Sequence, residues 1–105
     1  MKEPIIVQTD IKTNVRLEDQ HDFMANVTLG LADGGDFYLL IKFLDLNMEE
    51  LKTLAQLSKL RRRLSIKSDL IDKEKYNITH IVVTKFHVNN LSMTWECLSD
   101  DPSLY

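Results

Sequence analysis

The spacing of apolar residues changes twice along this chain, and this change constrains the fold more than any other feature. Apolar side chains occupy alternate positions over residues 5–17, again over 23–31, and again over 78–97. Between the second and third of these stretches, over residues 51–64, they recur every three or four positions. A period of two is typical of a strand with one buried face, and a period near 3.6 of an amphipathic helix. The sequence therefore predicts an α+β fold.

The first two predicted strands pair as an antiparallel hairpin. The polar segment 18–22 connects them. Pairing Leu17 with Phe23 sets Val15 opposite Ala25, which keeps the apolar rows of both strands on one face. We therefore expect the odd-numbered apolar residues of the whole first strand to be buried together.

A third strand follows the sequence Asp33-Gly34-Gly35. Glycine supplies the positive φ of a hairpin turn, and a three-residue loop here places Leu31 opposite Phe37. Residues 37–44 are apolar on both sides, which is typical of a central strand covered on both faces. The second cover comes either from the last hairpin or from a second subunit, and the latter would make the protein a homodimer.

A strong helix start follows at residues 46–51. Asn47 suits the N-cap, Glu50 suits the return bond of a capping box, and Leu46 suits a staple contact with Leu51. The leucines of residues 51–64 then share one broad arc, so we expect the helix to continue to Leu64 with this arc against the sheet. A short second helix is expected over residues 69–75.

The last hairpin is predicted from two further alternating segments, 78–88 and 91–97. A two-residue turn at Asn89-Asn90 pairs Val88 with Leu91 and keeps one apolar face. The predicted architecture is therefore an antiparallel sheet in the order β-β-β-α-β-β, with one main amphipathic helix packed on one face. We expect a single domain over residues 1–98 and a polar tail over residues 99–105.

Length and composition are consistent with this small single domain. The chain has 105 residues and one cysteine, so no intramolecular disulfide can form, which favours a reducing compartment. No stretch approaches the roughly 18 apolar residues of a membrane span, and the N-terminal apolar run is too short for a secretory signal. The expected location is the cytoplasm.

The sequence contains no catalytic, cofactor or metal-binding pattern. His80 and Cys97 fall on the same predicted face, but as diagonal neighbours with no carboxylate beside them. His21 and His87 do not share a face with His80, and the three glycines form no phosphate-binding loop. We therefore predict that the protein is not an enzyme and binds neither a metal nor a cofactor.

Two binding surfaces remain as candidates. The first is the long first strand, whose edge could accept another strand, although Lys12 and Arg16 on its outer side are also typical of an edge protected from pairing. The second is the outer face of the helix, where cations gather on a chain of net charge -3. The candidate partner-binding residues are Lys52, Lys59, Arg62, Arg63, Lys12 and Arg16.

These features predict a non-enzymatic protein-binding module, such as a small inhibitor, adaptor or accessory factor acting on a larger protein. It would use the sheet edge or the basic helix face. The alternative is a nucleic-acid-binding protein that uses the basic helix face. That face carries no aromatic residue on which a base could stack, and cations near a helix C-terminus also complement the helix dipole, so a protein partner is favoured.

Overall fold

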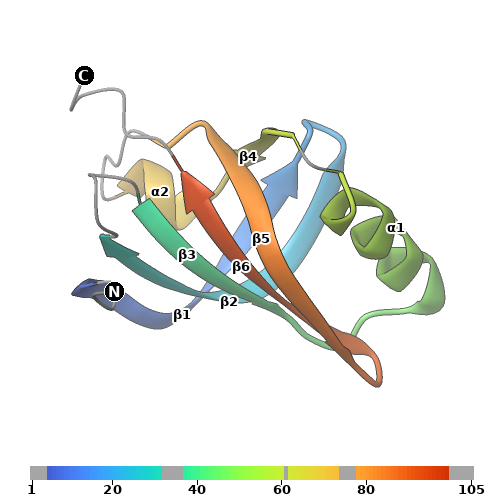
Figure 1. The fold of residues 1–105 in the computed structure, drawn as a ribbon. Coiled ribbons are helices and arrows are strands. Elements are labelled where there is room, and N and C mark those ends of the chain that lie inside the picture. The colour runs from blue at the N-terminus through green and yellow to red at the C-terminus, as the bar shows by residue number, and fades with distance from the viewer. Residues whose placement is uncertain (1–4, 32–36, 61, 74–77, 100–105) are drawn as a thin grey trace.

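The computed structural model describes residues 5–31, 37–60, 62–73 and 78–99, and these residues form a closed antiparallel β-barrel with two helices. The strands lie in the order β1-β2-β3-β6-β5-β4, and β4 pairs with β1 to close the barrel (Figure 1). The elements are β1 (Ile5–Leu17), β2 (His21–Leu31), β3 (Phe37–Phe43), α1 (Met48–Ser58), β4 (Leu64–Lys67), α2 (Asp69–Lys73), β5 (His80–Asn89) and β6 (Ser92–Ser99).

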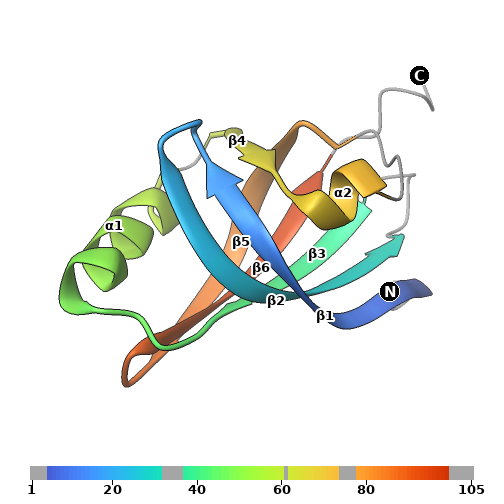
Figure 2. The same cartoon turned by 180° about the vertical axis from the view of Figure 1, so that it is seen from behind.

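The predicted α+β class, the antiparallel pairing and the main helix between the third strand and the next are confirmed. β1, β2 and β3 are successive neighbours, and the chain then passes through α1 to β4, which lies beside β1. This spatial order of four strands is a Greek key. Figures 1 and 2 show α1 on the side of the barrel away from the N-terminal end of β1. None of the described helices is long and apolar enough to cross a bilayer.

The core lies inside the barrel, on the face where alternate residues of the strands meet. Three aromatic rings form a row there, with edge-to-face contacts at centroid distances of 5.4 Å between Phe23 and Phe43 and 5.1 Å between Phe43 and Trp95. Such pairs add about 0.5–1.5 kcal/mol each to the burial of the rings. Leu54 and Leu57 of α1 join this core, so the helix contributes its apolar face as predicted.

The N-terminus of α1 also forms as predicted. The Asn47 side chain accepts a hydrogen bond of 2.8 Å from the backbone N–H of Glu50, and the Glu50 carboxylate accepts one of 3.0 Å from the N–H of Asn47. This reciprocal pair is a capping box. Leu46, directly before it, is buried.

The prediction that the helix continues to Leu64 is wrong, because α1 ends at Ser58. Leu64 instead begins β4, a four-residue strand that the sequence did not reveal. Leu64 stands two helical turns after Leu57, so it fits the helical period by coincidence. Within the described residues, β4 pairs with β1 at two positions and with β5 at two more. We call this short closure the β4 seam.

Both terminal hairpins keep the predicted partners but not the predicted register. Leu17 pairs with His21 rather than Phe23, because the turn of β1–β2 takes up only three residues. Val88 pairs with Met93 rather than Leu91, because the turn of β5–β6 lies at residues 90–91. Each error is a shift of two positions, and a shift of two does not by itself change which face a side chain occupies, so the apolar pattern cannot detect it.

The predicted inward face of β5 is wrong over its first half. Ile81 is buried and His80 is exposed, whereas the reverse was expected. A register shift between Val83 and Lys85 marks a bulge, and an extra residue there reverses which side chains face the core. After the bulge, Phe86 pairs with the buried Trp95. It therefore lies on the core side of β5, the face on which the sequence pattern placed it.

The second strand pair, β2–β3, has the expected register, with Leu31 opposite Phe37. The turn at Asp33-Gly34-Gly35 lies outside the described residues. The expected cover on both faces of β3 is absent from the described structure: its inner residues are buried, but Tyr38 and Leu40 on the outer surface stay half-buried. Ser99, assigned to the tail, is the last residue of β6, and residues 100–105 are not described.

Candidate functional site

The N-terminal half of β1 has a free backbone edge within the described structure. One side of β1 pairs with β2 along its length, whereas its other side pairs with β4 at Arg16 and Leu17. Next to these, α2 covers the strand: the backbone N–H of Leu70 donates to the Thr13 hydroxyl at 3.2 Å, and that of Asp69 donates to the Asn14 side chain at 2.9 Å. No described strand pairs with this side of Ile5–Lys12, which we call the β1 edge (Figure 2).

The β1 edge carries an unusual amount of exposed apolar surface. Ile5 is 70% exposed, Ile6 47%, Val7 42% and Ile11 37%. Leu31, which pairs with Ile5 at the end of β2, is also exposed. Large apolar side chains that gather in this way, rather than singly, mark interaction surfaces.

Bulges in the strand displace Val7 from the core face, whereas Ile5 and Ile11 stay opposite Leu31 and Val27 and are nevertheless exposed. The pairing of β1 with β2 shifts between Ile6 and Gln8 and again between Gln8 and Ile11. Gln8 therefore lies opposite the buried Leu29, on the core side that the sequence pattern gave to Val7. The expectation of one continuous buried row along β1 is wrong, and only Thr13, Val15 and Leu17 are buried.

Two local features hold the chain in this irregular path. Asp10 has a φ of 52°, and its backbone N–H donates to the Thr28 hydroxyl at 3.0 Å. Gly30 lies close under the start of β1, since a Cβ atom at this position would come within 2.8 Å of the Ile5 carbonyl oxygen. The edge thus departs from regular strand geometry at Asp10 and lies very close to β2 at Gly30. Both features limit the length of any regular pairing along it.

A hollow of about 460 Å³ lies beside the edge, between β1 and the start of α2. Gln8, Ile11 and Thr13 line one side of it, and Asp69 and Leu70 line the other. The hollow gives room for side chains of a segment that runs along β1. Its lining includes the apolar side chains of Ile11, Met24 and Leu70, which would contact an apolar occupant.

A second exposed apolar group lies at the tip of β5–β6 and the start of α1. The backbone N–H of Leu46 donates to the Leu91 carbonyl at 2.8 Å, which ties the two segments together. We call this group the tip cluster; its exposed members are Leu44, Met48, Phe86, Val88 and Leu91. Phe86 and Val88 belong to β5, whose second side pairs with β4 only at His80 and Ile81, so this cluster also borders a strand edge that no described strand pairs with. Unlike the β1 edge, however, this part of the molecule has the main helix in contact with the strand, since α1 contacts β5.

The predicted basic face does not form as a single helical surface. Lys52 lies on α1 and Lys59 is its C-cap, whereas Arg62 and Arg63 follow the end of the helix. Arg62 contacts Glu18 at 2.6 Å across the β4 seam. Their predicted grouping on one helix is therefore wrong, although their role in binding stays a prediction.

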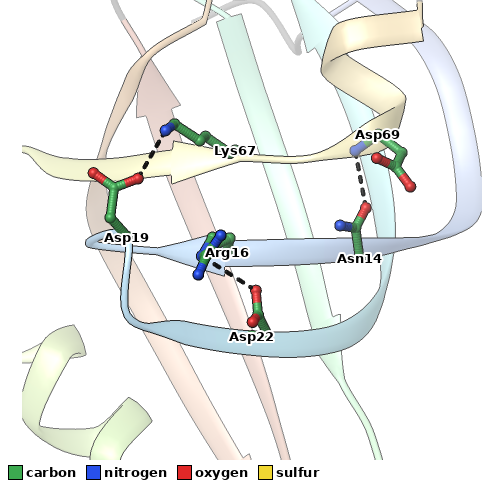
Figure 3. A network of polar contacts seen from close by, with 6 residues as sticks. All are labelled: Asn14, Arg16, Asp19, Asp22, Lys67 and Asp69. Atoms are coloured by element: carbon green, nitrogen blue, oxygen red, sulfur yellow. Dashed lines mark hydrogen bonds and ion pairs between the residues drawn. The ribbon is translucent and has the colours of Figure 1, made fainter.

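Ion pairs along the β1–β2 turn involve the other cations of this region (Figure 3). Arg16 lies 3.6 Å from Asp22, and Lys67 of β4 lies 2.9 Å from Asp19. Contact with Lys67 lowers the pKa of Asp19. These pairs lie next to the β4 seam, whereas Lys12, the remaining β1 candidate, is exposed on the β1 edge.

The thiol and imidazole considered as possible catalysts do not meet. Cys97 is fully buried, and burial raises the pKa of its thiol. His80 is exposed, and its Nδ1 lies 2.9 Å from the Thr79 hydroxyl. No three metal-ligating side chains gather among the described residues.

Comparison with protein-family models, curated proteins and solved structures gives no match to this chain. The apolar residues of the β1 edge were missed as a site because the alternating pattern assigned them to the core. The one available signal was the run Ile5-Ile6-Val7, where three apolar residues in succession break the alternation.

Proposed function

We propose that this chain is a non-enzymatic protein-binding module that receives an extended strand of a partner along the β1 edge. The observation that carries this proposal is the coincidence of a backbone edge that no described strand pairs with and the exposed side chains of Ile5, Ile6, Val7 and Ile11. A free edge alone, or scattered apolar residues alone, would be unremarkable on a small domain.

The chemistry of the edge supports a strand as the partner. The backbone N–H and C=O groups on the open side of a strand form hydrogen bonds with another extended chain, and side chains on both faces then select its sequence. Ile6 lies opposite Gly30, whereas Ile5 lies opposite Leu31, so apolar contacts are offered on both faces of β1. We therefore expect a partner segment with apolar residues on both faces.

The bulges and Asp10 set the size of this partner segment. A long, flat edge would pair without limit and aggregate, and bulges are a common protection against it. The paired segment should therefore be short, no longer than the stretch Ile5–Lys12. A small inhibitor, adaptor or accessory factor in a reducing compartment such as the cytoplasm fits these properties.

Site-specific photo-crosslinking tests the proposal. A photoreactive residue in place of Val7 should crosslink to a partner in the cells that make the protein, whereas the same residue in place of the exposed Lys85 of β5 should not. With the partner purified, Val7→Lys should weaken binding by roughly tenfold or more, equivalent to about 1.4 kcal/mol. Equal crosslinking at both positions, or unchanged binding of the variant, would contradict the use of this edge.

The nucleic-acid alternative is a separate prediction. It relies on Lys52, Lys59, Arg62 and Arg63, of which Arg62 already contacts Glu18. Titration with labelled DNA and RNA at two salt concentrations decides it, because binding through phosphates weakens steeply with salt. Loss of that binding in the double variant Lys59→Ala and Arg63→Ala would favour this alternative over strand pairing.

A further inference from the structure

The β1 edge has the same properties that we expect of its partner segment. It calls for a short, extended segment with apolar side chains on both faces and a free backbone edge, and β1 is itself such a segment. We propose that two copies of this chain pair through their β1 edges, antiparallel to each other about a two-fold axis. This inference depends on the proposed strand-binding function and names its occupant.

The extent of the free edge fixes the position of the axis. α2 contacts the strand at Thr13 and Asn14, so the stretch open to a second copy ends at Lys12. Residues opposite each other in an antiparallel pair lie on the same face of the sheet, so the axis passes through one residue rather than between two. Ile5, Gln8 and Ile11 share one face of β1, because they lie opposite Leu31, Leu29 and Val27 of β2. An axis at Gln8 therefore places Ile5 of each copy opposite Ile11 of the other, so that two apolar contacts form symmetrically.

The charges of the edge permit this contact. Asp10 and Lys12 are both exposed, so the edge carries one acidic and one basic side chain. Two copies therefore bring no excess of one sign together along the pairing, although the whole chain has a net charge of -3. Like charges placed directly opposite each other would have opposed the pairing.

The molar mass in solution, measured for the full chain over a dilution series, tests the proposal. We expect the mass to rise from the monomer value of 12.2 kDa toward twice that value with concentration. Ile6→Lys and Val7→Lys should each shift the dissociation constant upward at least tenfold. Val88→Lys in the tip cluster is the matched control, since Val88 is 51% exposed, slightly more than Ile6 and Val7, and it should leave the constant unchanged.

Disulfide trapping locates the axis independently. The native thiol of Cys97 is buried, so an introduced cysteine reports without background. Gln8→Cys should form a covalent dimer under mild oxidation, because a residue on the two-fold axis lies opposite its own copy. Asn89→Cys, exposed at the other end of the molecule, should not.

The outcomes separate this inference from the proposed function. A chain that stays monomeric at every concentration overturns the pairing of two copies, while crosslinking of a different protein at position 7 would still uphold strand binding. A dimer that Val88→Lys abolishes and Val7→Lys does not overturns the inference in favour of the tip cluster. Circular dichroism of each variant confirms that it is folded.

Discussion

Glu18 connects three segments at the β4 seam. It stands in the β1–β2 turn with a φ of 53°. Its backbone N–H donates to the Ser65 carbonyl at 2.9 Å, and its carboxylate accepts from the Ser65 N–H at 3.0 Å. The hydrogen bond from Ser65, followed by contact with Arg62, lowers the pKa of this carboxyl group. Glu18 therefore holds the N-terminal end of β4, a strand only four residues long, against the β1–β2 turn.

This environment predicts acid sensitivity. A carboxyl group with a lowered pKa stabilises the fold at pH values above its ordinary pKa, and this contribution is lost as the pH falls below that ordinary pKa and through the lowered one. Glu18→Gln should reduce the free energy of unfolding by about 1 kcal/mol near neutral pH and flatten its acid dependence. Urea unfolding at several pH values measures both effects. Asp19→Asn, at the exposed pair with Lys67, is the control and should change less.

Gly30 permits the close crossing of β1 over β2. A Cβ atom there would meet the Ile5 backbone, which cannot move aside as a flexible side chain could. Gly30→Ala should therefore loosen the start of β1 and speed amide hydrogen exchange over residues 5–8 several-fold, with little change elsewhere. Asn26→Ala in the same strand is the control. Unchanged exchange at residues 5–8 would show that the crossing tolerates a methyl group.

At the scale of elements, the start of α1 was predictable because its signals are local. Asn47 and Glu50 bond within one turn of the chain, independent of the rest of the fold. Asn47→Ala should lower the free energy of unfolding by about 1 kcal/mol, since it removes an N-cap hydrogen bond. Thermal unfolding beside Lys52→Ala, an exposed residue of the same helix, measures the difference. Equal effects of the two substitutions would argue against the cap.

The end of α1 and the strand β4 were not predictable for the opposite reason. The sequence from Lys59 to Leu64 has neither glycine nor proline, so no local signal ends the helix. β4 forms by pairing with β1 on one side and β5 on the other, so its formation depends on closure of the barrel and not on its own sequence. Ile66, buried in that strand, is placed by its neighbours and not by its own short segment.

The bulges limited the prediction of the candidate site. Alternation identifies the strands and their partners, but one extra residue reverses every later assignment of faces. This happened between Val83 and Lys85 in β5, whereas in β1 two shifts displace Val7 and leave Ile5 and Ile11 on their predicted face. The exposed residues of the β1 edge became visible only when the pairing with β2 was known. Sequence reasoning therefore singled out the first strand as a candidate surface but assigned the apolar residues of its first half to the core, and the binding roles of Lys12 and Arg16 stay predictions.

At the scale of the whole molecule, Cys97 reports on the integrity of the barrel. Its side chain is fully buried and burial raises its pKa, so a thiol reagent should reach it only when the barrel opens. We expect slow labelling without denaturant and a rise in rate that follows global unfolding, measured by Trp95 fluorescence. Thr9→Cys should label at once. Rapid native labelling of Cys97 would reveal local opening of the core.

The Greek-key order also bears on how quickly the native state is reached. β3 finds one neighbour in β2, directly before it, but its other neighbour is β6, which follows only after α1, β4, α2 and β5. Contacts between segments so distant along the chain carry a large loop-closure entropy and slow the search for the native topology. Refolding should therefore take milliseconds to seconds rather than microseconds. Until β6 pairs with β3, the ring of Phe43 lacks its contact with Trp95. The first three strands alone therefore form only part of the core.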